Sequence, residues 1–155
     1  MADKFVVTPY FFNPNIQPAD EYTKRRENLK TAIKGKSKSV IEEKYAPDEH
    51  SKEISADVSF PKRCLSCYRL RLERTARYAR ENGFDFFSTT LLVSPYQQHK
   101  ELKKIGVAAA AKYDIEFYYQ DFRPNFRKGQ NKARELGIYR QKYCGCLLSK
   151  TEAGH

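Results

Sequence analysis

The stretch Phe84-Asp85-Phe86-Phe87-Ser88-Thr89-Thr90-Leu91-Leu92 decides the fold. Its continuous run of apolar and threonine side chains is typical of a parallel strand that is buried on both faces. A helix stop, Asn82-Gly83, comes directly before it. Upstream, apolar residues recur every three or four positions and predict a helix from Arg63 to Asn82. The residues that form this apolar stripe are Leu65, Tyr68, Leu72, Ala76 and Ala79.

Strands and helices alternate on both sides of this stretch. The other expected strands are Phe5–Phe12, a short one around Val40-Ile41, and Tyr113–Tyr119. The other expected helices are Asp20–Lys34, Pro47–Glu53, one that begins at Ser94-Pro95 with Leu102, Ile105, Ala109 and Ala110 facing inward, and Phe126–Leu136. Tyr139–Leu148 is expected to be a short terminal segment. Such alternation predicts a single α/β domain over residues 1–155, with a parallel sheet covered by helices.

The loops at the carboxyl ends of parallel strands are the expected place for function in such a fold. In this sequence these loops are Asn13–Pro18, Thr89–Tyr96 and Gln120–Phe126.

The charge balance is strongly basic, with 29 Lys and Arg against 19 Asp and Glu, a net charge of +10. A surplus of this size in a small domain indicates a polyanionic partner such as a nucleic acid. Six acids gather between Glu42 and Asp57, and we expect them to form a solvated face turned away from the basic segments.

Other broad classes are excluded by composition. The 10 Phe and 11 Tyr are too many for a disordered chain. The longest apolar run, Gly106–Ala111, is too short to span a bilayer, and the N-terminus has no signal-peptide pattern. These features predict a soluble cytoplasmic protein with no membrane partner.

Four cysteines occur as two close pairs. Cys64 and Cys67 form a CxxC at the start of the expected central helix, beside Arg63 and Arg69. Two thiolates one helical turn apart can hold a metal or a cluster, or form a redox pair whose first thiol is activated by the helix N-terminus. No apolar strand leads directly into Cys64, which argues against a thioredoxin-like arrangement.

The second pair, Cys144 and Cys146, forms a CxC around Gly145, near the end of the chain. A disulfide inside a CxC closes a small strained ring, and strained disulfides are readily reduced. Redox cycling is therefore the favoured role, and we expect Gly145 to leave both thiols movable. The alternative is that this pair chelates an additional iron or other metal ion.

Five motifs in this order resemble the QueH-type epoxyqueuosine reductases over roughly Val6–Ser149. They are Phe11-Phe12-Asn13-Pro14-Asn15-Ile16, Arg63-Cys64-Leu65-Ser66-Cys67-Tyr68-Arg69-Leu70-Arg71-Leu72-Glu73, Thr89-Thr90-Leu91-Leu92-Val93-Ser94-Pro95-Tyr96, Asp121-Phe122-Arg123-Pro124 and Tyr139-Arg140-Gln141-Lys142-Tyr143-Cys144-Gly145-Cys146. The resemblance implies an enzyme that reduces epoxyqueuosine to queuosine at the wobble position of a tRNA anticodon. It also implies a Rossmann-like, three-layer fold related to nucleotide-binding α/β domains.

The resemblance further implies roles for the cysteines. Cys64 and Cys67 match two ligands of a [4Fe-4S] cluster, and Cys144 and Cys146 match the redox-active pair. Family members usually begin with another strand and a loop whose adjacent cysteines complete the cluster. No cysteine precedes Cys64 here, and we therefore expect the chain to be N-terminally incomplete relative to the family.

Further site residues are expected around these motifs. Asp121, at a strand end beside Arg123, is a candidate catalytic proton donor or metal neighbour; a helix cap or a salt bridge to Arg123 is the alternative. His99 is expected to be a solvated residue at a helix start. The residues expected to contact the tRNA are Asn13, Asn15, Ser94, Tyr96, Arg123, Tyr139 and Arg140.

Aromatic side chains near basic residues can stack on an unpaired anticodon base, although core packing is the commoner role of such rings. The candidates are Tyr96, Tyr118, Phe126 and Tyr139. The sequence has no glycine-rich dinucleotide fingerprint, so the electrons are expected to come through metal or thiols from an external electron donor.

A rival hypothesis from another class is a zinc-stabilised nucleic-acid-binding module without catalysis. In it, Cys64, Cys67, Cys144 and Cys146 close one tetrahedral site. The long gap between the two pairs weakens this hypothesis, whereas the lack of a cysteine before Cys64 favours it.

Overall fold

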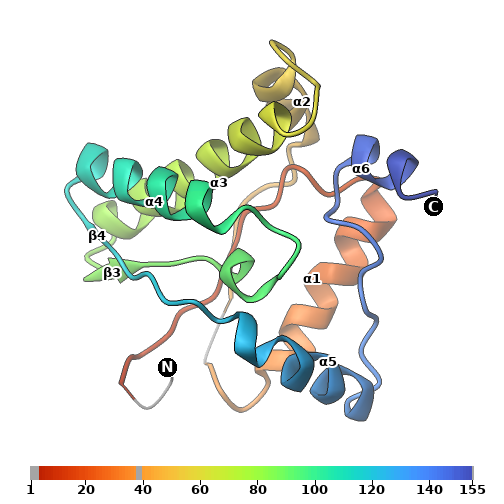
Figure 1. Ribbon diagram of the computed structural model, residues 1–155. Coiled ribbons are helices and arrows are strands. Elements are labelled where there is room, and N and C mark those ends of the chain that lie inside the picture. The colour runs from red at the N-terminus through yellow and green to blue at the C-terminus, as the bar shows by residue number, and fades with distance from the viewer. Residues whose placement is uncertain (1–3, 38–39, 155) are drawn as a thin grey trace. The chain divides into compact units, whose positions relative to one another are not determined.

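The computed structural model describes residues 4–37 and 40–154 and has a mixed α/β fold (Figure 1). These residues form six α-helices, two short 3₁₀ helices and two separate pairs of parallel strands. The predicted α/β class and the parallel pairing are therefore confirmed. None of the helices in the described residues is long and apolar enough to cross a bilayer.

The chain divides into two compact units. The central unit is Asp48–Gly129, and the terminal unit combines the residues up to Pro47 with those from Gln130 onward. The central unit contains α2 (Pro47–Ile54), α3 (Lys62–Glu81), β3 (Phe86–Phe87), η1 (Thr90–Val93), α4 (His99–Tyr113), β4 (Glu116–Phe117) and η2 (Arg123–Asn125). The terminal unit contains β1 (Tyr10–Phe11), α1 (Ala19–Ile33), β2 (Ile41–Glu42) and α6 (Leu147–Glu152), and α5 (Phe126–Glu135) crosses the boundary. The prediction of one domain stays a prediction.

The core of the central unit lies between α3, α4 and the β3–β4 pair. Helices α3 and α4 run side by side (Figure 1). The buried core residues are Tyr68, Leu72, Ala76, Ala79, Phe87, Leu92, Leu102 and Ala109, with Leu65, Ile105 and Ala110 packed against them. Both apolar stripes expected from the sequence thus face the core, and this prediction is confirmed.

Close packing of α4 on β4 depends on a glycine. A Cβ atom at Gly106 would lie 2.3 Å from a ring carbon of Phe117, far inside van der Waals contact. The Phe117 ring also packs against Phe87, with centroids 5.1 Å apart. The absent side chain at this position lets the helix lie directly on the aromatic pair of the small sheet.

The predicted strand from Phe84 to Leu92 is much shorter in the structure. Only Phe86 and Phe87 pair with β4, and the chain then turns into η1. The Thr89 hydroxyl accepts a hydrogen bond from the Leu91 amide at 3.2 Å. Such local side-chain bonding competes with the strand ladder, and it ends the strand before Leu91.

The next helix begins at His99, four or five residues after the predicted start. The Ser94 hydroxyl accepts from the Tyr96 amide at 3.2 Å, and the Tyr68 hydroxyl accepts from the Gln98 amide at 3.3 Å. These bonds hold the preceding segment in a turn. The prediction of a solvated His99 is wrong: the side chain is 8% exposed, and its Nε2 lies 3.1 Å from the Ser94 carbonyl oxygen.

The terminal unit has a smaller core. Its buried residues Phe11, Ile16 and Tyr22 pack with Leu29, Val40 and Tyr45. Strand β1 pairs with β2 so that Tyr10 lies opposite Ile41; the predicted strand Phe5–Phe12 is thus shortened to two residues. Helix α6 was not expected from the sequence, which predicts only a short terminal segment over Tyr139–Leu148.

The acidic residues between Glu42 and Asp57 do not form a face turned away from the basic ones, and that prediction is wrong. Glu49 and Glu53 of α2 pair with Arg74 and Arg69 of α3, at 2.5 and 3.1 Å. Glu42 pairs with Lys30 of α1 at 2.9 Å. Opposite charges spread along the sequence are thereby brought together, and part of the basic surplus is neutralised locally.

A buried histidine predicts pH-dependent stability. Burial lowers the pKa of His50 in α2 to about 4, and the Arg71 charge adds to this effect. The unfolded chain takes up this proton near pH 6.5, so stability is fully present above that pH and is lost as the pH falls toward 4. We expect the free energy of unfolding to fall by about 2 kcal/mol between pH 8 and pH 5 from this group, measured by urea denaturation.

The matched control for this effect is His50→Gln, which cannot take up the proton. Between pH 8 and pH 5, the free energy of unfolding of this variant should fall by about 2 kcal/mol less than that of the wild type. An equal loss in wild type and variant would contradict the assignment to His50.

Candidate active site

The first cysteine pair lies on the first two turns of α3. Cys64 and Cys67 are three residues apart, so their side chains stand one above the other on the same helix face. Both side chains are partly buried. The preceding Arg63 is itself buried and donates to the Val58 carbonyl at 3.0 Å. The helix start thus carries two thiols that follow a buried arginine in the sequence.

Tyr68 ties this helix turn to the loop before α4. Its hydroxyl donates to Gln97 Oε1 at 2.5 Å and accepts from the Gln98 amide. Burial is the main cause that raises the pKa of Tyr68 to about 12, with a smaller contribution from the nearby Cys64 and Cys67. The hydroxyl therefore stays protonated at neutral pH, and the hydrogen bonds fix the position of the CxxC turn.

The thiol pair fits part of a metal site. Thiolates are ligands for zinc and for iron–sulfur clusters, and two of them one turn apart can reach one centre. Within residues 4–37 and 40–154, no group of three or more His, Cys, Asp or Glu side chains gathers closely enough to hold a metal ion. Cys64 and Cys67 therefore fit as two ligands of a site, which leaves the other ligands to be supplied.

The second cysteine pair lies on a loop of the terminal unit whose backbone is tightly held. The Cys144 carbonyl accepts from Arg25 at 2.9 Å and from Asn15 Nδ2 at 3.2 Å. The Gly145 carbonyl accepts from the Gln17 amide at 2.9 Å. Cys146 is buried and precedes α6, and Cys144 is partly buried. The CxC backbone is therefore held by two side chains and one amide from earlier in the chain, and the movement of both thiols stays a prediction.

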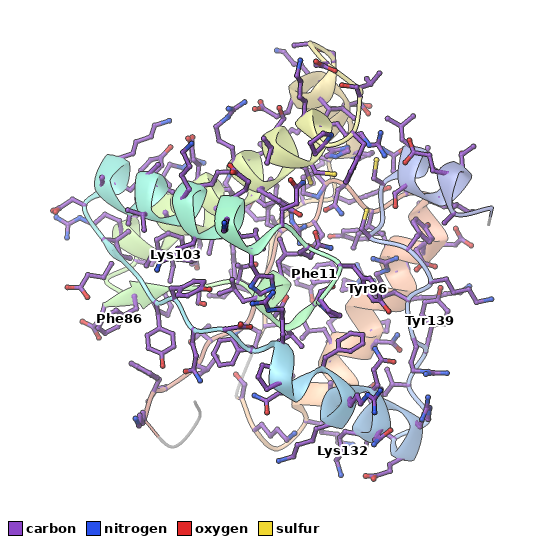
Figure 2. All side chains as sticks on the ribbon, viewed as in Figure 1. Phe11, Phe86, Tyr96, Lys103, Lys132 and Tyr139 are labelled. Carbon is purple, nitrogen blue, oxygen red and sulfur yellow. The ribbon has the colours of Figure 1, made fainter. Side chains whose placement is uncertain are left out.

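A cleft of about 310 Å³ opens beside this loop. Its lining comes from the first turns of α1 and from the segment that leads into and past the CxC: Pro18, Asp20, Glu21, Lys24, Tyr139, Lys142, Tyr143 and Lys150. The Nζ atom of Lys24 lies 5.5 Å from the centre of the Tyr139 ring, and the Nζ atom of Lys150 lies 5.8 Å from the centre of the Tyr143 ring. Figure 2 labels Tyr139 on the segment next to α1. Three lysines and two aromatic rings thus surround a space one residue from Cys144.

Another group of candidate residues lies on η1, η2 and their flanking loops in the central unit. Tyr96, which is labelled in Figure 2, is 83% exposed. Its ring meets that of Phe126 edge to face, with centroids 5.9 Å apart. Asp121 forms a two-oxygen contact with the Arg123 guanidinium, at 2.6 and 2.8 Å. These hydrogen bonds lower the pKa of Asp121 to about 2. Asp121 is therefore a carboxylate at neutral pH and forms the salt bridge that the sequence offered as its alternative role.

The remaining predicted residues have defined places. Asn15 is 2% exposed, and its Oδ1 has no hydrogen-bond partner in the part of the chain that the structure describes. The Asn13 carbonyl accepts from the Ile16 amide at 3.2 Å. Arg140 is exposed and donates to Gln130 Oε1 at 3.3 Å.

Sequence reasoning missed Glu21 and Arg25, which are buried next to the CxC loop. Their four-residue spacing on an expected helix could have predicted an ion pair between them, but it could not have predicted that the pair is buried.

Fold and site together define an α/β protein with two thiol pairs. One pair lies at the start of a helix. The other lies on a loop whose backbone is held by hydrogen bonds, beside a cleft lined by lysines and tyrosines. The family model for epoxyqueuosine reductase QueH matches residues 1–152. The chain belongs to this family of oxidoreductases, as the resemblance in its motifs predicted.

Curated relatives agree with the family match, and each is named epoxyqueuosine reductase QueH. The protein of Thermotoga maritima is 40% identical, over 92% of this chain and 79% of its own length. That of Dehalococcoides mccartyi is 35% identical, over 96% and 81%. That of Streptococcus pyogenes is 32% identical, over 96% of this chain and 62% of its own length.

Proposed function

We propose that this protein reduces epoxyqueuosine to queuosine at the wobble position of tRNA. The observation that carries the proposal is membership of the epoxyqueuosine reductase family over residues 1–152. The presence of two cysteine pairs supports it, since removal of an epoxide oxygen needs electrons as well as protons.

The proposed reaction balances with the CxC pair as the immediate reductant. The two C–O bonds of the epoxide break, a carbon–carbon double bond forms, and the oxygen leaves as water after taking up two protons. The two electrons come from the thiols of Cys144 and Cys146, which lose their protons and form a disulfide. An external electron donor then supplies two electrons and two protons to restore both thiols.

A [4Fe-4S] cluster is the cofactor that goes with this proposal, with Cys64 and Cys67 as two of its ligands. When bound, it would supply electrons one at a time. The additional iron or other metal ion remains the alternative role for Cys144 and Cys146. Burial and the carboxylate of Glu21 raise the pKa of Tyr139, so its phenol stays protonated in the cleft and donates a hydrogen bond.

The cleft beside the CxC supports tRNA as the substrate. Its lysines suit phosphate groups, and its tyrosine rings suit an unpaired base. We include Asn13, Asn15, Ser94, Tyr96, Arg123, Tyr139 and Arg140 in the proposed tRNA contacts. Asp121, a carboxylate at neutral pH, keeps only the metal-neighbour part of its proposed catalytic role. A tRNA substrate also goes with the predicted cytoplasmic location.

Binding of tRNA is expected to weaken steeply with salt. If about four to six phosphates are contacted, the logarithm of the association constant should fall with a slope of roughly −3 to −5 against the logarithm of salt concentration. Lys142→Ala should reduce the slope by about one. Filter binding or fluorescence anisotropy at several salt concentrations measures this.

The matched control is Lys112→Ala. Lys112 forms an ion pair with Glu73 at 2.8 Å, so its loss should leave the slope unchanged. A flat salt dependence of the wild type would contradict phosphate recognition by the basic surface.

The finer fold prediction also belongs to this proposal. We propose that the two parallel strand pairs and their helices are parts of one Rossmann-like, three-layer domain. The alternation of strands and helices along the chain supports this arrangement.

Family membership favours this enzyme over a zinc-stabilised binding module built from the same four cysteines. The proposal is tested in a bacterial strain whose own epoxyqueuosine reductase has been deleted. Expression of this chain should restore queuosine in tRNA. Persistence of epoxyqueuosine alone, with the protein present in the cell extract and retaining iron, would count against the proposal.

A further inference from the structure

One arginine holds the backbone of the loop that carries the second cysteine pair through hydrogen bonds. Arg25 of α1 donates from its two terminal nitrogens to two consecutive carbonyls, those of Tyr143 at 2.8 Å and Cys144 at 2.9 Å. The guanidinium also lies 5.1 Å from the centre of the Tyr143 ring. A planar fork of donors can span adjacent carbonyls in this way, whereas a lysine ammonium acts at one point.

The arginine is itself held in place by a buried carboxylate. Glu21, one helical turn earlier, accepts from Arg25 Nε at 2.8 Å, and the two side chains are 8% and 9% exposed. The Tyr139 hydroxyl lies 3.1 Å from both carboxylate oxygens of Glu21. Tyr139 and Glu21 line the cleft. A chain of hydrogen bonds thus runs from the cleft wall through Glu21 and Arg25 to the cysteine loop.

The loop has little freedom to respond to a change at the cysteines. Gly145 has a φ of +120°, and a Cβ atom there would lie 2.9 Å from Ile16 Cγ1. The Gly145 carbonyl is held by the Gln17 amide, and that of Cys146 accepts from the Lys150 amide at 3.0 Å. Each carbonyl from Tyr143 to Cys146 therefore accepts a hydrogen bond in this structure, in which Cys144 and Cys146 do not form a disulfide.

We infer that Arg25, held by Glu21, is a positioning residue that keeps the Cys144–Cys146 pair in its dithiol conformation and makes its disulfide easy to reduce. The inference rests on the proposed redox role of this pair. Disulfide geometry is specific, and we expect ring closure to shift the Tyr143 and Cys144 carbonyls that Arg25 holds. A loop that resists closure gives a strained disulfide with a higher reduction potential.

Arg25→Lys tests this inference in the full chain. The chain is equilibrated with mixtures of reduced and oxidised dithiothreitol, and free thiols are counted by alkylation and mass spectrometry. When the Cys144–Cys146 bond forms, both S–H bonds break, and two electrons and two protons pass to oxidised dithiothreitol, whose own S–S bond opens. We expect the variant to favour the protein disulfide about tenfold more than wild type does, which corresponds to about 30 mV.

Arg26→Lys is the matched control, because it makes the same change one residue later in α1. Arg26 is more exposed and pairs with Glu27 at 3.2 Å; its replacement should leave the equilibrium unchanged. A second variant, Tyr139→Phe, removes only the hydroxyl that donates to Glu21 and should shift the equilibrium in the same direction by a smaller factor. It keeps the test valid if Arg25→Lys fails to fold.

The outcomes separate this inference from the proposed function. An equilibrium within twofold of wild type in both Arg25→Lys and Tyr139→Phe, or a shift toward the dithiol, would overturn the positioning role while leaving the redox pair intact. Failure of wild type to form any Cys144–Cys146 disulfide would instead overturn the redox role, and the inference with it.

Discussion

Cys144→Ser and Cys146→Ser are each expected to abolish the conversion of epoxyqueuosine to queuosine, by roughly 10³-fold or more. A serine hydroxyl cannot supply the electrons that a thiol gives up in forming a disulfide. Both residues lie on the clamped loop beside the cleft, so a smaller side chain of similar shape should leave the loop bonds to Arg25 and Gln17 in place. The measurement is nucleoside analysis of tRNA after a timed incubation with the enzyme and a reductant.

The control for this pair is Ser149→Ala in α6, three residues after Cys146, which should retain activity. Thiol counting then separates a redox role from metal ligation. Oxidised, metal-free wild type should carry two fewer reactive thiols than reduced protein, with the bond between Cys144 and Cys146. Two free thiols after oxidation, together with loss of one metal equivalent in either serine variant, would reject the redox pair in favour of ligation.

Cys64→Ser and Cys67→Ser are each expected to abolish retention of the proposed iron–sulfur cluster in the full-length protein. The two thiols lie on one face of the first two turns of α3, so loss of either would leave an iron without its protein ligand. Iron content and visible absorption after anaerobic reconstitution measure the effect. The expected result is a colourless protein with iron near the background level.

Ser66→Ala is the matched control, since Ser66 lies between the two cysteines on the same helix turn. It should keep the iron content of the wild type. Unchanged iron in both cysteine variants would refute the assignment of this turn as a cluster site, and about one zinc per chain with no iron would favour the zinc-stabilised module.

The helices were predictable because their apolar stripes have a clear period. Leu72, Ala76 and Leu102 are buried as the spacing of the sequence predicts. The strands were predicted too long. For Phe84–Leu92, the composition does not indicate that the Thr89 hydroxyl accepts a hydrogen bond from the Leu91 amide, which turns the chain. Local side-chain bonds of this kind compete with the ladder at a level that composition does not capture.

The cysteine motifs could be recognised from their spacing alone. The side chains that hold the cysteine loop in place could not be predicted. Glu21 and Arg25 look like an ordinary exposed pair one turn apart on a helix. Their burial depends on the chain returning some 120 residues later to lie against α1, as the bonds from Arg25 to Tyr143 and Cys144 record. Long-range contacts of polar groups leave no periodic signal in the sequence.

The most direct test of the central claim uses purified protein and tRNA that carries epoxyqueuosine. After anaerobic incubation with a chemical reductant, the tRNA is digested and its nucleosides are separated by chromatography and mass spectrometry. The account predicts that epoxyqueuosine disappears and queuosine, lighter by one oxygen atom, appears in equal amount, with no conversion by the Cys144→Ser variant. Recovery of unchanged epoxyqueuosine from iron-loaded, reduced wild-type protein that binds the tRNA would contradict it.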